Sequence, residues 1–298
     1  MIPEFPEFKP LNLDDRSDVA TVVCAFPPYS DFNFANMYAW DTQGAVRISR
    51  LHDNLVFKLL DYLSETPFLT FVGLNRAADT ARLLLDLAHT QLNGAPLHFV
   101  PEETAQLLAA EGFNVIEDPS SNDYIFSVEH VAGMHNWGRH SSCRRLRQFS
   151  DRFPDYRTVL LPLAKIDLDE YAALFDTWGK RRGITNSRGT KEFRAFERLF
   201  HLPATNEVTA LYADGTLIGF STFELVQQST AITQFSKANH AIHPGVCDVL
   251  YWEEAKLLLD KGIKYYNWEQ DMGIPNLRQS KQKYGPSYFL KKYSITLP

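Results

Sequence analysis

One order of predicted elements occurs twice along the chain, and this repetition restricts the fold more than any other feature of the sequence. In the first half, apolar residues at helical or alternating spacing predict two helices, three strands, a helix, a strand, a further helix and final strands. The helices are expected at 14–24, 32–40, 75–92 and 102–111, and the strands at 45–49, 55–60, 68–72, 97–100, 113–116 and 124–127. The chain therefore begins with one complete α+β unit.

The second half repeats this order. Helices are expected at 137–153, 167–182, 191–200 and 246–259, and strands at 156–161, 208–212, 217–226, 231–235, 264–268 and 288–295. Asp214 and Gly215 lie between two β-rich runs and predict a tight antiparallel hairpin. Because two copies of one unit explain the order more economically than one long fold, we expect an α+β protein with domains at 1–125 and 126–298.

The two predicted domains differ in charge. Residues 1–125 hold 7 Lys and Arg against 18 Asp and Glu, whereas residues 126–298 hold 23 against 18. An anionic ligand is therefore expected in the second domain.

The sequence contains no apolar run that approaches the roughly 18 residues of a membrane span. The spacing of Cys24, Cys143 and Cys247 indicates neither a disulfide framework nor a metal site. We therefore expect a cytoplasmic protein without a metal.

A polar motif follows the predicted strand at 264–268. It reads Asn267-Trp268-Glu269-Gln270-Asp271-Met272-Gly273, and is followed by Leu277-Arg278, Lys281, Tyr284, Pro286 and Leu290-Lys291. With the element order, this pattern resembles a bacterial family related to the C-terminal domain of phosphatidylglycerol lysyltransferase, which is similar to the Fem-type aminoacyl-transferases. The resemblance implies two tandem GNAT-like (acyl-CoA N-acyltransferase) domains, each a mixed, mostly antiparallel sheet flanked by helices, with the active cleft in the second domain.

The carboxylates of this motif are candidate catalytic groups. Two neighbouring carboxylates with separated pKa values allow one of them to accept a proton from an attacking amine or hydroxyl. We therefore expect Glu269 or Asp271 to act as a base or a substrate anchor, with Asn267 and Gln270 as binding residues beside them. The alternative is structural: Asp271 forms a turn with Gly273, and Glu269 pairs with an arginine.

Basic residues follow the motif. Arg278, Lys281 and Lys283 precede Tyr284 and predict a cationic loop that neutralises the phosphate or carboxylate of a substrate. A solvated basic loop is the alternative. In the resembled family this run belongs to the recognisable motif, which favours ligand binding.

Two further features of the second half suggest phosphate binding and stacking. Arg144, Arg145 and Arg147 lie on a predicted amphipathic helix, where they are expected to hold the phosphates of coenzyme A or of an RNA acceptor stem. Trp178 is a candidate for stacking in an acyl or base pocket. The alternatives are a solvated charged face and a core aromatic.

A motif of acetyl-coenzyme A enzymes is missing. In those GNAT proteins an Arg/Gln-x-x-Gly-x-Gly/Ala loop cradles the pyrophosphate at a helix N-terminus, and neither 239–245 nor 72–75 has this pattern. The departure argues against ordinary acetyl-coenzyme A use. It favours an aminoacyl or other activated donor, or a loss of catalysis.

These observations predict an acyltransferase or aminoacyltransferase that moves an activated group to an amine or hydroxyl. Such a transfer depends mainly on positioning the two substrates and polarising the acyl carbonyl, so no covalent nucleophile and no cofactor are required. The donor is left open between acyl-CoA and aminoacyl-tRNA, and a peripheral contact with lipid also stays open. The alternatives are a non-catalytic GNAT-like ligand-binding module and an RNA-interacting protein, which steep salt dependence of binding would indicate.

Overall fold

The structure of the protein is a computed structural model, and it describes residues 1–202, 206–227 and 229–297. The chain forms two compact units: unit 1 is Met1–Tyr124, Glu269–Lys283 and Tyr288–Pro298, and unit 2 is Ile125–Trp268 and Tyr284–Ser287. The first boundary between the units follows Tyr124, one residue before the predicted boundary. The division differs from the predicted one in that two late segments belong to unit 1, because the last strand of the chain completes a sheet there.

The first sheet of unit 1 has the order β1-β2-β3-β4 and is antiparallel. Its strands are β1 (Lys9–Pro10), β2 (Arg47–Leu51), β3 (Asn54–Leu60) and β4 (Pro67–Val72). His52 and Asp53 both have positive φ and form the two-residue turn between β2 and β3, a geometry that suits the twist of a hairpin. The short helices η1 (Leu13–Asp15), α1 (Arg16–Val23), η2 (Ser30–Phe32) and α2 (Phe34–Trp40) come before β2.

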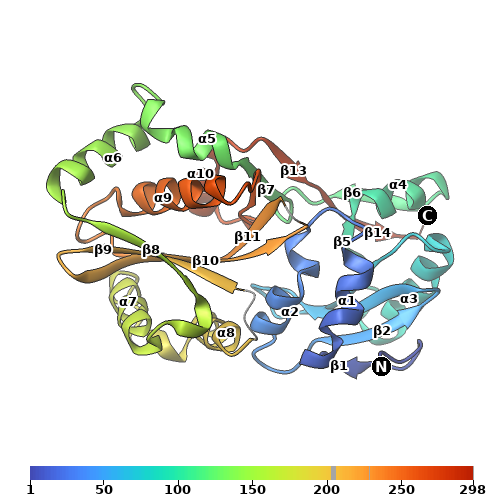
Figure 1. The fold of residues 1–298 in the computed structure, drawn as a ribbon. Helices are drawn as coiled ribbons and strands as arrows, with labels where there is room; N and C mark the ends of the chain where they lie inside the picture. Colours follow the sequence, from blue (N-terminus) through green and yellow to red (C-terminus); the bar gives the residue numbers. More distant parts are fainter. Residues whose placement is uncertain (203–205, 228, 298) are drawn as a thin grey trace. The chain divides into compact units, whose positions relative to one another are not determined.

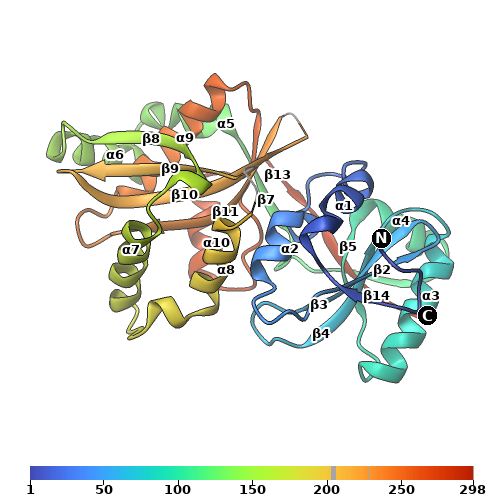
Figure 2. The same ribbon diagram turned by 60° about the horizontal axis from the view of Figure 1, so that its bottom comes forward.

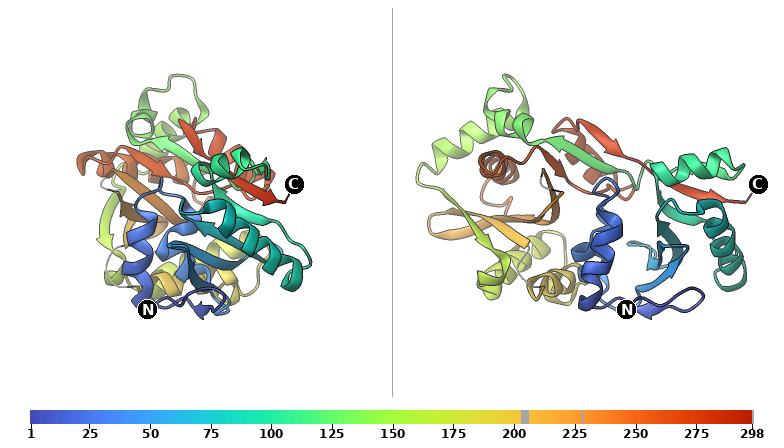
Figure 3. Two further views of the ribbon diagram at one scale, coloured as in Figure 1. Left: turned by 90° about the vertical axis from the view of Figure 1, so that its right-hand side faces the viewer. Right: turned by 45° about the vertical axis from the view of Figure 1, so that its right-hand side comes forward.

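The second sheet of unit 1 has the order β5-β14-β6 (Figures 1 and 3). It consists of β5 (Leu97–Pro101), β14 (Lys292–Thr296) and β6 (Asn114–Glu117), with the helices α3 (Ala77–Gln91) and α4 (Glu102–Ala110) before and after β5. In α3, Ala81, Leu84, Leu85 and Ala88 recur at helical spacing and are buried in a core that also contains Ile295 of β14. The end of the chain is thereby anchored in unit 1.

Unit 2 is built on a seven-stranded sheet with the order β13-β7-β12-β11-β10-β9-β8, in which the edge strand β13 is Tyr288–Leu290. The other strands are β7 (Asp123–Ser127), β12 (Tyr265–Asn267), β11 (Thr230–Ala238), β10 (Thr216–Val226), β9 (Asn206–Ala213) and β8 (Arg157–Pro162). From β7 to β8, all neighbours are antiparallel except β11 and β12. The predicted hairpin is confirmed, since Asp214 and Gly215 have positive φ between β9 and β10.

Helices cover both faces of this sheet, as Figures 1 and 2 show. One face carries α5 (Val128–Ala132), α6 (Ser141–Arg152) and α9 (Val246–Asp260), and the other carries α7 (Leu168–Arg181) and α8 (Lys191–Phe200). The short turns η3 (Gly133–Asn136), η4 (Leu163–Lys165) and η5 (Ser187–Gly189) connect them. Tyr171 of α7 contacts Phe220 of β10 with ring centroids 4.9 Å apart, so α7 is held by aromatic packing.

The structure corrects two predicted elements. The expected cationic loop after the motif is instead the helix α10 (Pro275–Gln282), which begins with proline at a position where the missing N–H costs nothing. The strand expected at 288–295 is divided at Lys291 into β13 (Tyr288–Leu290) and β14.

Among the described residues, none of the helices combines the length and the apolar character needed to cross a membrane.

Candidate functional site

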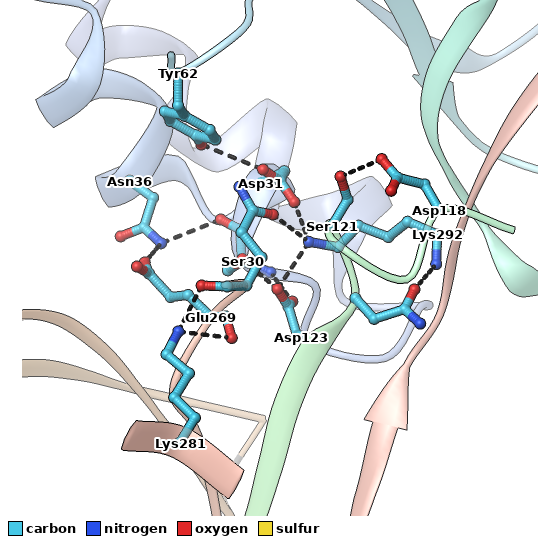
Figure 4. A network of polar contacts seen from close by, with 12 residues as sticks. Ser30, Asp31, Asn36, Tyr62, Asp118, Ser121, Asp123, Glu269, Lys281 and Lys292 are labelled. Carbon is cyan, nitrogen blue, oxygen red and sulfur yellow. Dashed lines mark hydrogen bonds and ion pairs between the residues drawn. The ribbon is translucent and has the colours of Figure 1, made fainter. Parts of the chain in front are cut away.

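Polar side chains from distant parts of the sequence meet inside unit 1 (Figure 4). They come from η2, α2, the turn after β3, the start of β7, the segment before α10, α10 itself and β14. We call them the polar cluster: Ser30, Asp31, Asn36, Tyr62, Asp123, Glu269, Gln270, Lys281 and Lys292. Most of these residues are buried, so their hydrogen bonds and charges must be balanced within the protein.

Lys292 lies at the centre of the polar cluster and has no exposed surface. Its Nζ forms an ion pair with Asp31, lies 2.7 Å from Oδ1 of Asp123 and donates to Oε1 of Gln270 at 3.0 Å. Burial by itself would lower the pKa of Lys292, but the two carboxylates outweigh it and raise the pKa above the usual value. Lys292 is therefore a charged lysine in the interior of unit 1.

The two aspartates are held by further donors. Asp123 accepts hydrogen bonds from the backbone N–H and the Oγ of Ser30, both at 2.7 Å. Asp31 accepts one from the Tyr62 hydroxyl at 3.2 Å. Burial raises the pKa of Asp31, Lys292 opposes this change, and the neighbouring Asp123 adds to it. Asp31, Asp123 and Lys292 thus form a buried ion triad with a complete set of partners.

Glu269 lies beside this triad and is half-buried. Its backbone has φ of 57°, a left-handed conformation that non-glycine residues rarely adopt. Nδ2 of Asn36 donates to Oε1 of Glu269 at 2.7 Å and to the carbonyl oxygen of Ser30 at 3.1 Å. Burial raises the pKa of Glu269 to about 8, against the effect of Lys281 and with that of Asp123 and Asp31.

Lys281 of α10 complements this carboxyl group. Its Nζ donates to the carbonyl oxygens of Glu269 and Gln270, at 3.1 Å and 2.5 Å. Burial lowers the pKa of Lys281 to about 8, and the nearby Glu269 opposes the change. Glu269 and Lys281 therefore both exchange protons close to neutral pH, which is the range that suits a general acid or base.

Asp271 has a different environment. Its carboxylate accepts hydrogen bonds from Nε and Nη2 of Arg278 at 2.8 and 2.9 Å, from the Tyr124 hydroxyl at 2.6 Å and from the Gly273 N–H at 2.8 Å. Although burial favours the neutral acid, these hydrogen bonds lower the pKa of Asp271. Asp271 therefore remains an anion that joins the motif to α10, and Arg278 is engaged in holding it.

The remaining predicted site residues divide between the two units. Lys283 directly follows α10 in unit 1 and is half-buried. In unit 2, Asn267 is fully buried at the end of β12, and the Tyr284 hydroxyl donates to Asp248 of α9 at 2.9 Å. Arg145 of α6 lies 3.7 Å from the same aspartate. Tyr284 and Arg145 thus meet at Asp248.

The last three predicted site residues, Arg144, Arg147 and Trp178, also lie in unit 2. Arg144 and Arg147 are exposed on α6, as expected for a cationic face. Trp178 is half-buried, with Nζ of Lys237 4.3 Å and the guanidinium carbon of Arg182 4.7 Å from its ring. The sequence resemblance implies a cleft in the second domain, whereas Glu269 and Lys281 belong to unit 1.

Sequence reasoning missed most of the polar cluster. Asp31, Asn36, Asp123 and Lys292 were not among the predicted residues, although all are buried. One signal was present: Lys292 interrupts a predicted strand, and a lysine at an inward position requires a buried partner. Among the described residues, no group of three or more His, Cys, Asp or Glu side chains is arranged to hold a metal ion.

The sequence model of the family described as "Phosphatidylglycerol lysyltransferase, C-terminal" matches residues 26–296. No curated protein matches the chain. A solved structure of a conserved protein of unknown function from Bacteroides thetaiotaomicron VPI-5482 is similar over 100% of both chains, with 24% identity and a TM-score of 0.82.

Two further solved structures share the fold of this chain. The structure of FemX matches 97% of this chain and 96% of its own, with 10% identity and a TM-score of 0.59. A tandem GNAT protein from the clavulanic acid biosynthesis pathway matches 97% of each chain, with 14% identity and a TM-score of 0.51. At these identities the likeness concerns the fold, and the predicted tandem GNAT-like α+β architecture is confirmed.

Proposed function

Because the chain belongs to the family of the phosphatidylglycerol lysyltransferase C-terminal domain, we propose that it is an aminoacyltransferase in which Glu269 accepts a proton from the acceptor. Family and fold point to an aminoacyltransferase-like GNAT protein. The observation that carries the residue assignment is the carboxyl group of Glu269, which is held by Asn36 and has its pKa raised to about 8 beside Lys281. The acceptor is an amine or a hydroxyl.

The proposed step requires the acceptor to lose a proton as its nitrogen or oxygen attacks the acyl carbonyl. A base works best when its pKa is near the operating pH, and Glu269 meets this condition. Glu269 must be ionised to act, so kcat/KM, which reports the pKa values of the free enzyme, is expected to rise as the pH increases through about 8. Asp271 and Arg278 serve as positioning residues, because they fix the segment between Glu269 and α10.

Aminoacyl-tRNA is the proposed donor. Arg144 and Arg147 form an exposed basic surface on α6, which suits a polyanion better than a small neutral ligand. The loop at 239–245 lacks the pyrophosphate-binding pattern of acetyl-coenzyme A enzymes, which argues against that donor. The family description names lysyl transfer to phosphatidylglycerol, so lysyl-tRNA and phosphatidylglycerol are the first donor and acceptor to test.

The test is a transfer assay with the purified protein and labelled aminoacyl-tRNA. One arm offers phosphatidylglycerol vesicles and the other a mixture of water-soluble amines and alcohols, and the label transferred to each acceptor is measured. We expect transfer by the wild type and a loss of roughly 100-fold or more in kcat for Glu269→Gln. Glu103→Gln is the matched control, since Glu103 is also a half-buried glutamate of unit 1 and accepts a hydrogen bond from Tyr29.

Three outcomes would overturn the proposal or a part of it. Equal activity of wild type and Glu269→Gln would remove Glu269 from the proton transfer. Binding of aminoacyl-tRNA without transfer to any acceptor would favour a ligand-binding module that has lost catalysis. Transfer from acyl-CoA, and not from aminoacyl-tRNA, would identify a different donor and leave the assignment of Glu269 to be judged by the same two variants.

A further inference from the structure

The side chain of Asn36 has one atom without a partner. Asn36 is 2% exposed, and among the described residues no donor reaches its Oδ1. Its Nδ2 donates to the Ser30 carbonyl oxygen and to Oε1 of Glu269. Because both neighbours are acceptors, they fix which end of the amide is nitrogen and which is oxygen. A buried acceptor left without a donor is unfavourable, so this position calls for a hydrogen-bond donor.

The charges of the polar cluster call for a cation at the same place. The cluster contains the carboxyl groups of Asp31, Asp123 and Glu269, and the ammonium groups of Lys281 and Lys292. Asp31 on η2, Asp123 on β7, Lys292 on β14 and Lys281 on α10 surround Glu269, and Tyr62 lies beside Asp31. If all five groups ionise, one negative charge remains in excess. In the free protein a proton on Glu269 removes this excess.

One chemical group satisfies both demands. A primary ammonium carries one positive charge and three N–H donors, so it can donate to an amide oxygen and to a carboxylate at once. Figure 4 shows the Asn36 amide next to the Glu269 carboxyl group, on the opposite side of the cluster from Asp118. We propose that Oδ1 of Asn36 and the carboxylate of Glu269 form a binding site in unit 1 for the primary ammonium group of a substrate.

This inference rests on the proposed function in one respect: the ammonium belongs to the aminoacyl group or to the amine acceptor. Binding leaves all covalent bonds of the substrate intact. The Glu269 carboxylic acid loses its proton to solvent, and the resulting carboxylate pairs with the substrate ammonium. A divalent cation fits less well, because Asp31 and Asp123 are already engaged by Lys292.

The test uses three small ligands that differ only in the group of interest. n-Butylammonium has charge and N–H donors, butyltrimethylammonium has charge without N–H donors, and 1-butanol has no charge. We expect binding of n-butylammonium and at least roughly tenfold weaker binding of the other two. Calorimetric titrations in two buffers of different ionisation enthalpy measure proton release, which should approach one proton at neutral pH and vanish well above a pH of about 8.

Variants locate the site. Glu269→Gln should abolish proton release and weaken n-butylammonium binding by roughly tenfold or more, and Asn36→Leu should weaken it similarly. Glu103→Gln is expected to bind like the wild type. If Asn36→Leu does not fold, Glu269→Gln and the proton count of the wild type still decide the question. Equal binding of butyltrimethylammonium, or binding without proton release at neutral pH, would overturn the inference.

The binding experiment and the transfer assay test the two proposals independently of each other. Ammonium binding with proton release but without any transfer would keep this site and remove the proposed function. Transfer that depends on Glu269, together with no ammonium binding, would keep the function and remove this site.

Discussion

Lys292 has no exposed side-chain surface, and its charge is balanced by Asp31 and Asp123. Lys292→Met removes the cation and leaves two carboxylates buried next to each other. We expect a loss of about 3–5 kcal/mol in the free energy of unfolding at neutral pH, measured by urea denaturation. Lys291→Met is the control, because Lys291 is 42% exposed and pairs with Glu117 near the surface, where about 1 kcal/mol or less is expected.

The pH dependence of the stability of Lys292→Met provides a second test of the buried triad. Burial raises the pKa of Asp31 and Lys292 opposes this change, so without Lys292 the folded state binds more protons than the unfolded state. The deficit of Lys292→Met relative to the wild type should therefore shrink as the pH is lowered. Equal stability of Lys292→Met and Lys291→Met would contradict the idea that the buried triad requires its cation.

Glu254 gives a prediction for unit 2. It is fully buried on α9, accepts a hydrogen bond from Ser221 at 3.0 Å, and its pKa is raised by burial to about 7. Because the folded state holds this proton more tightly, Glu254 lowers the stability as the pH rises from about 4.5 to about 7, and the loss is constant above that range.

Glu254→Gln removes this titration. The stability of the variant relative to the wild type should increase by about 2 kcal/mol between about pH 5 and about pH 8, measured by urea denaturation at each pH. Glu253→Gln, one residue earlier and bonded to Tyr156, is the control for the loss of a glutamate on α9. A parallel pH dependence of Glu254→Gln and wild type would show that Glu254 is ionised in the folded state.

At the residue scale, the sequence placed Glu269, Gln270 and Asp271 correctly after a strand. Their roles depend on partners that lie far away in the sequence. Asn36 determines the surroundings of Glu269, and Arg278 those of Asp271. The structural alternative for Asp271, a turn with Gly273, agrees with the observed hydrogen bond. For Glu269 the neighbouring cation is Lys281, and no local pattern distinguishes it from the other basic residues of that stretch.

At the scale of elements, the short segment between the motif and α10 depends on Gly273. This residue has φ of 70°, and a Cβ there would lie 3.4 Å from the side chain of Ser120. Gly273→Ala should therefore cost about 1 kcal/mol or slightly more in the free energy of unfolding, measured by urea denaturation. Gly133→Ala is the control, because Gly133 has φ of −76° and no atom within 4 Å of a Cβ. A neutral Gly273→Ala would mean that the turn is not under conformational constraint.

The elements that were predicted well are those with strong local patterns. Lys191–Phe200 and the β9–β10 hairpin follow directly from apolar spacing and turn residues. The helix α10 was missed because none of its residues is fully buried and it has no apolar stripe. It is held instead by Arg278 and Lys281, whose partners lie before the helix begins. Patterns of hydrophobicity do not report such contacts.

At the scale of the whole molecule, the sequence predicted two units of one type but not which segments complete each of them. β14 pairs with β5 and β6, nearly 200 residues earlier for β5, as shown by Tyr293 opposite Val100. Such pairing depends on the packing of Ile295 in the core of unit 1 and leaves no local signature. For this reason the predicted second domain ended with residues that belong to unit 1.

The uneven charge of the chain leads to the last prediction, which concerns binding of the proposed donor. The basic face of α6 lies in unit 2, and each arginine that neutralises an RNA phosphate adds about 0.7–0.9 to the slope of log K against log salt. Replacing Arg144 and Arg147 together by Gln should weaken aminoacyl-tRNA binding and reduce this slope by about 1.5, measured by fluorescence anisotropy over a series of KCl concentrations. The matched control replaces two exposed arginines of unit 1, Arg76 at the N-cap of α3 and Arg82 within α3. An equal loss of affinity in both double variants would indicate attraction by net charge alone. An unchanged slope for the α6 variant would mean that the donor binds elsewhere, because removing a phosphate contact changes the number of released counterions.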